Sequence, residues 1–467
     1  MALPSVVVFS LKDTSPVRYL SITGPDCLLR YDPKEGVFSP TAKFAVEPVG
    51  NGLVHLRSCY HNHYWARELE TEPWLSASAK NPVEDSSNES CTLFKTYMNS
   101  GNWVRFQHVR SGLNVVVRPA EEAFPYYLAV ENSAPSEFKY IDYESLVKIP
   151  RYVMFKGDND KYLSHNTHSQ GYLHFLDIQV PTHRGVGFET SVTQDGDIRL
   201  KHMLLDKFLR FSRTYYEWIW ADYPADSNPA KQDTLFQVVP SKPTSTIPSG
   251  GGIALRCRGN YLFCKRLTDS TGITSCLAAA TDSPDESHAC LLPIDAGKPN
   301  KRRVTIKAFR QGRVYNRASE KVWSQVFDNQ TNITNQSQAT ISYTVTNKQT
   351  FSCSISQPSG IEANFTGQIP VISHHYGLQI PNEVTSDVRS GWGQTRDLSE
   401  HHTVGYSINV PPFTKVTSSY WIETATCEVP FSYEQSDEFF FGGTATQLLH
   451  DGVFRGVYTI GMEILKS

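Results

Sequence analysis

Two-residue alternation of apolar and polar side chains is the most persistent pattern in the C-terminal part of the chain. Residues 361–366 (IEANFT) alternate, and residues 376–380 (YGLQI) alternate again. A short apolar stretch, 369–372, lies between these two arms. Because a period of two is typical of a strand with one buried face, the pattern predicts a two-faced β-hairpin with an apolar tip.

The same alternation continues over unusually long segments on both sides of this hairpin. Residues 338–356 alternate for most of their length, and so do residues 402–434, which are interrupted at Pro411-Pro412. Ordinary strands have roughly 3–10 residues. These segments therefore predict elongated strands in a domain that is not a compact sandwich.

The first part of the chain contains a duplication. Phe44 and Phe188 lie 144 residues apart, and so do Trp74 and Trp218. A constant offset over many positions indicates two homologous domains of about 140 residues.

Each of these domains also repeats within itself. In the second, residues 157–165, 204–212 and 258–266 each place polar turn residues before an aromatic-apolar pair. Such pairs are strand-entry signals, and three all-β units that close a barrel predict a β-trefoil.

The predicted fold class is therefore all-β, with two tandem β-trefoil domains followed by an elongated domain of long twisted strands. The expected boundaries are 1–145 and 149–295 for the trefoils, 296–303 for a polar linker, and 304–467 for the elongated domain.

Composition excludes several classes of function. The 467-residue chain has a net charge of -3, and Lys and Arg form no long run, so we expect no nucleic-acid partner. The nine scattered cysteines form no CxxC pair and favour reduced thiols. No apolar window is long enough for a transmembrane helix, and the N-terminus lacks a basic region. We expect a cytoplasmic or nucleocytoplasmic protein made without a signal peptide.

No catalytic or metal-binding motif stands out. The neighbouring histidines at 374–375 and 401–402 would point to opposite faces of a strand, whereas a metal site needs three or four converging ligands. We expect no enzymatic activity, no cofactor and no metal.

Extended motifs in the first 295 residues resemble the amaranthin lectins, which have two β-trefoil domains. These motifs are GLVHLRSCY (52–60), WLSASAKNP (74–82), CTLFK (91–95), FKGDNDKYL (155–163) and KRLTDSTGITSCLAAATDSPDE (265–286). The resemblance implies binding of glycans of the galactose/N-acetylgalactosamine type, notably the T-antigen. It also implies a site between the first domain of one subunit and the second domain of its partner in a head-to-tail dimer.

The family site draws on a loop before the tryptophan of the first domain, here Trp74. The family carries Asn, His and Tyr before that tryptophan, whereas Thr71, Glu72 and Pro73 stand here, a departure that weighs against T-antigen specificity. An aromatic ring that stacks on a sugar, with planar polar groups beside it, fits such a site. The alternative is that Trp74 and Trp218 are equivalent core residues. The candidate carbohydrate-binding residues are Arg67, Thr71, Glu72, Trp74, Tyr215, Tyr216 and Trp220.

The region after residue 300 resembles the aerolysin-type β-pore-forming module. The resemblance rests on the long Ser/Thr-rich strands, on the two-faced hairpin with Trp392 near its end, and on VPPFTKVTSSYWIE (410–423). It implies a homo-oligomer in which each subunit contributes one hairpin to a transmembrane barrel, since one hairpin cannot close a barrel. The candidate membrane-insertion residues are Ile361, Phe365, Ile369, Pro370, Val371, Ile372, Tyr376, Leu378 and Ile380.

Before insertion, the apolar face of the hairpin has to be covered, so we expect it to lie weakly held against the long strands of its own domain. The sequence thus predicts a carbohydrate-binding plant lectin with a pore-forming tail that acts on glycosylated membranes, with a role in defence. Two alternatives stay open. The hairpin is packed permanently on its domain, or the protein is a non-lytic glycan-binding or scaffold lectin whose tail serves only for assembly.

Overall fold

The computed structural model describes residues 2–466, apart from 12–16, 68–70, 120–125, 166–170, 179–181, 214–216, 226–227, 229, 244–246, 248–250, 269–273, 354–360, 374–376 and 383–384. The chain forms two compact units. The first contains Met1–Lys301 together with Asp437–Ala445, and the second contains the rest of the C-terminal region from Arg302 onward. Among the residues described, no helix is long and apolar enough to cross a membrane.

Six strands of the N-terminal domain close a barrel through successive antiparallel pairings. The barrel strands are β1 (Val6–Leu11), β4 (Phe44–Gly50), β5 (Leu53–Ser58), β8 (Phe94–Asn99), β9 (Trp103–His108) and β12 (Phe138–Asp142). Three further hairpins extend the barrel: β2 (Tyr19–Ser21) with β3 (Arg30–Asp32), β6 (Tyr64–Arg67) with β7 (Leu75–Ala79), and β10 (Asn114–Pro119) with β11 (Tyr126–Glu131). A 3-10 turn, η1 (Pro40–Ala42), precedes β4.

This closed ring with three hairpins is the predicted β-trefoil. Its interior is filled by aromatic rings around Phe9, whose centroid lies 5.8 Å from that of Trp65 and 5.6 Å from that of Phe106. Closure leaves no exposed edge on the barrel strands, which suits an all-β domain in water.

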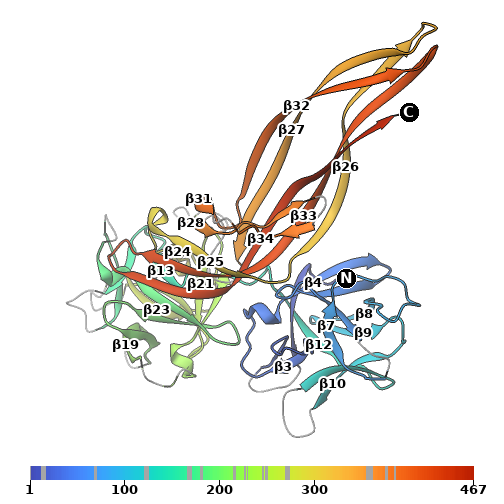
Figure 1. The fold of residues 1–467 in the computed structure, drawn as a ribbon. Helices are drawn as coiled ribbons and strands as arrows, with labels where there is room; N and C mark the ends of the chain where they lie inside the picture. The colour runs from blue at the N-terminus through green and yellow to red at the C-terminus, as the bar shows by residue number, and fades with distance from the viewer. Residues whose placement is uncertain are drawn as a thin grey trace. The chain divides into compact units, whose positions relative to one another are not determined.

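The second domain repeats the arrangement (Figure 1). Its ring strands are β13 (Tyr152–Lys156), β16 (Phe188–Val192), β17 (Ile198–His202), β20 (Phe236–Pro240), β21 (Ile253–Cys257) and β24 (Leu292–Asp295). Its hairpins are β14 (Tyr162–His165) with β15 (Leu173–Leu176), β18 (Lys207–Phe211) with β19 (Ile219–Pro224), and β22 (Phe263–Leu267) with β23 (Cys276–Thr281). The short 3-10 turns are η2 (Arg184–Val186), η3 (Gln232–Thr234), η4 (Ser287–Ala289) and η5 (Pro299–Lys301).

The duplication seen in the sequence is therefore a duplication of structure. Phe44 begins β4 and Phe188 begins β16, at the same point of each barrel. The repeated tryptophans also correspond, since Trp74 bridges to Ala129 and Trp218 bridges to Ala278.

The C-terminal unit is built from the long strands that the alternation predicts, and Figure 1 shows their extended, twisted course. One sheet runs in the order β31-β28-β25-β33-β34-β27-β32, with β26 paired to β33. Its strands are β25 (Arg303–Phe309), β26 (Arg313–Asn329), β27 (Asn335–Cys353), β28 (Glu362–Gly367), β31 (Thr385–Gly391), β32 (Thr395–Val410), β33 (Thr414–Glu438) and β34 (Thr444–Lys466).

The alternation of side chains is visible in the burial of β27. Ile341, Tyr343 and Val345 are buried and pack with Tyr420 and Ile422 of β33, while the residues between them face solvent. β27 and β32 pair from Asn335↔Val410 to Thr350↔Thr395. Pro411 follows directly, where a proline can no longer interrupt the ladder.

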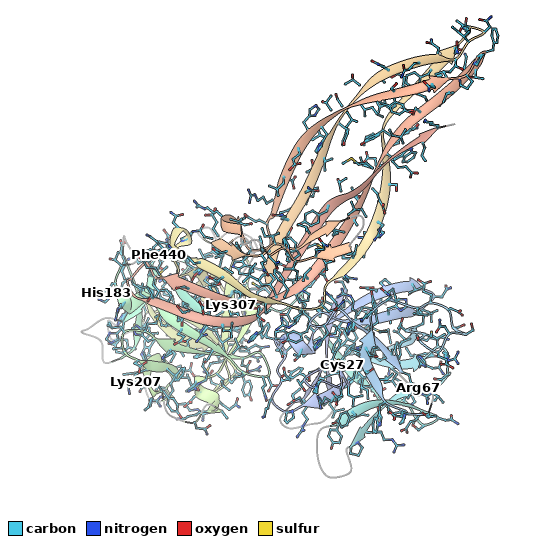
Figure 2. The ribbon with its side chains drawn as sticks, viewed as in Figure 1. Cys27, Arg67, His183, Lys207, Lys307 and Phe440 are labelled. Atoms are coloured by element: carbon cyan, nitrogen blue, oxygen red, sulfur yellow. The ribbon has the colours of Figure 1, made fainter. Side chains whose placement is uncertain are left out.

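The turn between β33 and β34 departs from the expected boundary of the third domain. Residues Asp437–Ala445 pack within the first unit, where Phe439 and Phe441 join a buried cluster with Met154, Val186 and Ala296. The Phe439 ring lies 4.7 Å from that of Tyr152. Figure 2 marks Phe440 on this turn. Burial of two phenylalanines explains why a segment from the end of the chain belongs to this unit.

The predicted hairpin has a different topology from the expected one. β28 does not pair with residues 376–380 but lies antiparallel to β31, with Phe365 opposite Val388. The apolar stretch is not a tip, because Val371–Ser373 forms β29 and pairs with β30 (Gly377–Gln379). The register of this pair shifts between Phe365 and Gly367, and at Gly367, the last residue of β28, a Cβ would lie 2.7 Å from the Cβ of Ile306.

Candidate functional site

The predicted sugar-binding loop of the first domain connects β6 to β7. Arg67 is the last residue of β6, and its Nε donates a hydrogen bond to the Glu72 carbonyl, 2.8 Å away. Thr71 and Glu72 are exposed, and the Pro73 carbonyl accepts from the Val130 amide at 2.8 Å. The loop is thus tied to its own domain at both ends. Figure 2 shows Arg67 on the first domain.

Trp74 is half-buried and forms an aromatic corner with Tyr127. The two ring centroids lie 5.7 Å apart with the planes 62° from parallel. The Arg30 guanidinium lies 6.0 Å from the centroid of Tyr127. Sequence reasoning missed Arg30 and Tyr127, since both reach the loop from strands far away in the chain. An aromatic ring flanked by guanidinium and carbonyl groups is the chemistry that a saccharide site requires.

The repeated tryptophans differ in burial. Trp218 is 1% exposed and packs with Cys276 and Ala278, as a core residue does. Trp74 occupies the corresponding position but keeps part of its ring at the surface. The interpretation of both tryptophans as equivalent core residues therefore holds for Trp218 alone.

Trp220, the described candidate of the second domain, lies on β19 of that trefoil and not on the first-domain loop. Trp220 is half-buried on β19 and meets Tyr172 edge to face, with ring centroids 5.4 Å apart. Tyr215 and Tyr216 lie outside the described residues.

Two arginines, Arg67 and Arg110, act on the nearby His108. Burial lowers the pKa of His108, and the charges of Arg67 and Arg110 lower it further, against a hydrogen bond with the Cys91 carbonyl that raises it. His108 therefore stays neutral near pH 7. The described polar side chains of the loop belong to Arg67, Thr71 and Glu72. They offer a guanidinium, a hydroxyl and a carboxylate, which favour hydrogen bonding over proton transfer.

The candidate insertion residues occupy the core of the C-terminal unit. Phe365 is 2% exposed, and its ring stacks on Phe351 with a centroid distance of 4.3 Å. Ile372 and Pro370 are also buried, and the Pro370 carbonyl accepts a 2.6 Å hydrogen bond from the Tyr458 hydroxyl. Ile361, Ile369, Val371 and Leu378 are partly buried against the same core.

Two remaining members of this set lie elsewhere. Ile380 is 40% exposed, and Tyr376 is outside the described residues. The expectation that the apolar face is covered by its own domain is confirmed for the buried members. The core that covers it is rich in aromatic rings, and the weak hold stays a prediction.

Among the described residues, no three His, Cys, Asp or Glu side chains converge as metal ligands would. The nine cysteines are thiols, and Cys27, Cys59 and Cys353 are the half-buried ones.

Comparison with known proteins finds a family for the N-terminal domain. Residues 2–118 match the Agglutinin domain family. No curated protein matches the chain.

Several solved structures are similar at low identity. A mosquitocidal holotoxin matches with 9% identity and a TM-score of 0.29, covering 62% of this chain and 34% of its own. A lamprey immune protein matches with 12% identity and a TM-score of 0.28, and the match covers 78% of this chain and 86% of the lamprey chain. A non-toxic crystal protein from Bacillus thuringiensis matches with 10% identity and a TM-score of 0.20, and the match covers 37% of this chain and 86% of the crystal protein. The chain thus spans about a third of the holotoxin's length, and likenesses of this level do not bear on function.

The matched residues 2–118 include the Arg67–Trp74 loop and most strands of the first barrel. The first trefoil is therefore similar to the Agglutinin domain family, which confirms the lectin resemblance in this part of the chain.

Proposed function

We propose that the protein is a non-enzymatic lectin that binds glycans through its trefoils and then inserts strands of its C-terminal unit into a membrane as a homo-oligomer. The Arg67–Trp74 loop, with Tyr127 and Arg30, supports the glycan-binding step because it combines an aromatic corner with planar polar groups. Glycans of the galactose/N-acetylgalactosamine type are the ligands that the family resemblance favours. A role in defence follows from lysis of foreign or damaged membranes.

The observation that carries the second step is the burial of Phe365, Ile372 and Trp392, which lie in the segment that connects two long paired strands. β27 ends at Cys353 and β32 begins at Thr395, and these strands pair with each other. Release of the intervening segment would lengthen this hairpin without breaking its existing ladder. Phe365, Ile372 and Trp392 would exchange a protein core for lipid, at little cost in apolar burial.

Covalent locking of the segment tests this step. Thr305 of β25 and Thr366 of β28 are Cα partners in a parallel pair, a spacing suited to a disulfide. We expect Thr305→Cys/Thr366→Cys to prevent dye leakage from liposomes that carry asialo-ganglioside glycans, and we expect a reductant to restore it. Single-cysteine variants with and without reductant are the matched controls.

A second candidate function rests on the tightness of the same core. The Phe351–Phe365 stack and the Phe365–Trp392 contact at 4.9 Å favour a segment that never leaves, in a lectin whose tail only assembles subunits. Electron microscopy on the same liposomes distinguishes membrane insertion from assembly alone. Rings with leakage support insertion, whereas bound particles without leakage, unaffected by the lock, support assembly alone.

A further inference from the structure

A polar depression on the second trefoil lies outside both the Arg67–Trp74 loop and the C-terminal unit. It has a volume of about 440 Å³ and is formed by the end of β18, the residues after it, η3 and Gly259. Six polar residues line it: Arg210, Ser212, Arg213, Lys231, Gln232 and Asp233. Gly259 allows the close approach of η3, because a Cβ at this position would lie 3.0 Å from the Asp233 Cα.

The cations of this depression are held in place by the domain itself. Arg210 forms a bidentate pair with Asp222, with Nε–Oδ1 and Nη2–Oδ2 distances of 3.0 and 2.6 Å. Lys231 lies over the Tyr223 ring, 4.7 Å from its centroid, and 3.4 Å from Asp233 Oδ2. The three positive charges of Arg210, Arg213 and Lys231 outnumber the two carboxylates of Asp222 and Asp233. The net charge is therefore positive, and the depression favours an anion.

Arg213 is the cation of the depression with the most N–H donors available to a ligand. It is exposed, and its Nη2 donates one hydrogen bond, 3.2 Å long, to the Gly259 carbonyl. A guanidinium has five N–H donors in a planar fork that matches a carboxylate or a sulfate.

Asp233 supplies a hydrogen-bond acceptor to the depression, whereas Arg213 supplies donors. Its Oδ1 is buried and accepts no hydrogen bond within the part of the chain that the structure describes. A buried acceptor without a donor carries a desolvation cost. A ligand hydroxyl that donates to Oδ1 would remove this cost.

We propose that this depression is a second carbohydrate site, specific for an acidic saccharide. The anionic group of the sugar, a carboxylate or a sulfate ester, pairs with Arg213, and a neighbouring hydroxyl donates to Asp233 Oδ1. The combination of spare guanidinium and buried acceptor selects a sugar that carries both groups over a simple anion or a neutral sugar. The site requires neither the Arg67–Trp74 loop nor insertion by the C-terminal unit.

Calorimetric titration of the full-length protein at fixed salt tests this proposal. The probes are a sulfated heparin-derived disaccharide, sialyllactose as the carboxylate, lactose as the neutral sugar and inorganic sulfate as the simple anion. We expect at least one acidic saccharide to bind, with an affinity on the order of tenfold above that of lactose and of sulfate. The two acidic probes distinguish a sulfate ester from a carboxylate.

Variants locate the binding. Arg213→Gln and Asp233→Asn should each weaken binding of the acidic saccharide about tenfold, and Arg213→Lys should recover only part of the loss because the planar fork is missing. Lys242→Gln is the matched control, since it removes one positive charge from an exposed pair with Asp285 on the same domain. Trp74→Ala should leave this binding intact while it removes binding at the first-domain loop.

Three results would overturn the proposal: no binding of either acidic saccharide, equal binding of inorganic sulfate, or equal losses in Arg213→Gln and Lys242→Gln. Unchanged thermal unfolding of Arg213→Gln verifies that the exposed substitution leaves the domain folded.

Discussion

Phe351 of β27 and Phe365 of β28 stack almost face to face, with ring centroids 4.3 Å apart and planes 16° from parallel. The stack continues from Phe365 to Trp392 at 4.9 Å and from Trp392 to Tyr433 at 5.0 Å. These four rings join the candidate insertion segment to the long strands β27 and β33. The apolar face of this segment is therefore part of the core, and its release has to break this chain of rings.

Removal of the central ring should loosen the segment. We expect Phe365→Ala to lower the free energy of unfolding of the C-terminal unit by about 3–5 kcal/mol, because the buried ring leaves a cavity. Chemical denaturation, with hydrogen exchange of residues 361–366 as the local probe, measures the change. Ile380→Ala is the matched control, since Ile380 is 40% exposed and surface changes stay within about 0.5 kcal/mol. Equal losses of unfolding free energy in both variants would show that the Phe351–Phe365 stack adds no stability beyond that of a surface side chain.

The aromatic corner should determine glycan binding by the first domain. We expect Trp74→Ala to weaken binding on a glycan array and in titration at least about fivefold, since it removes a ring that can stack on the sugar. Tyr97→Ala removes another exposed aromatic ring from the same domain, at β8, and should leave binding unchanged. Binding that survives Trp74→Ala would remove this loop from the site.

The turn between β33 and β34 should stabilise the second trefoil. Phe439 is 2% exposed against the ring of Tyr152, so we expect Phe439→Ala to cost about 3–5 kcal/mol and to raise hydrogen exchange in β13. Phe440 is only partly buried, and Phe440→Ala should have a smaller effect. If the two variants are indistinguishable, the turn is not anchored by Phe439.

Acid should destabilise the second trefoil through His202. Burial, with smaller contributions from the neighbouring His165 and His183 and against a hydrogen bond with the Gly185 carbonyl, lowers the pKa of His202 to about 4. In the unfolded chain a histidine has a pKa near 6.5, so between these values the unfolded state binds the proton first. Stability should be complete above about pH 6.5 and fall by on the order of 3 kcal/mol as the pH is lowered to about 4.

Thermal unfolding between pH 7 and pH 4 measures this dependence. His202→Gln should reduce its slope, because glutamine keeps a donor for the Gly185 carbonyl but does not titrate in this range. A slope that is the same in the variant would assign the acid sensitivity to other groups.

Much of the fold could be predicted because it rests on local periodicity. The alternation in 338–356 predicts β27, and Pro411-Pro412 marks the end of β32, since both depend on neighbouring residues in the chain. The offset of 144 between Trp74 and Trp218 predicts the duplicated trefoils, because equal positions in equal barrels keep equal spacing.

The candidate sites were only partly predictable. Trp74 was found from the sequence, but its partner Tyr127 comes from β11, and only the barrel closure brings the two together. Asp233 and Arg213 carry no motif, and their relation to one depression depends on η3 approaching Gly259.

The sequence by itself determined the strand content, the twofold repeat and the apolar face of residues 361–372, because alternation and repetition are properties of the chain. Only the tertiary structure decided which strands pair and what covers that face. The expected hairpin turn at 369–372 instead contributes Val371 and Ile372 to β29, which pairs with β30. The Phe365 ring stacks on that of Phe351. The physical reason is that a period of two specifies a buried face but not its partner, and the partner is the surface that excludes water best.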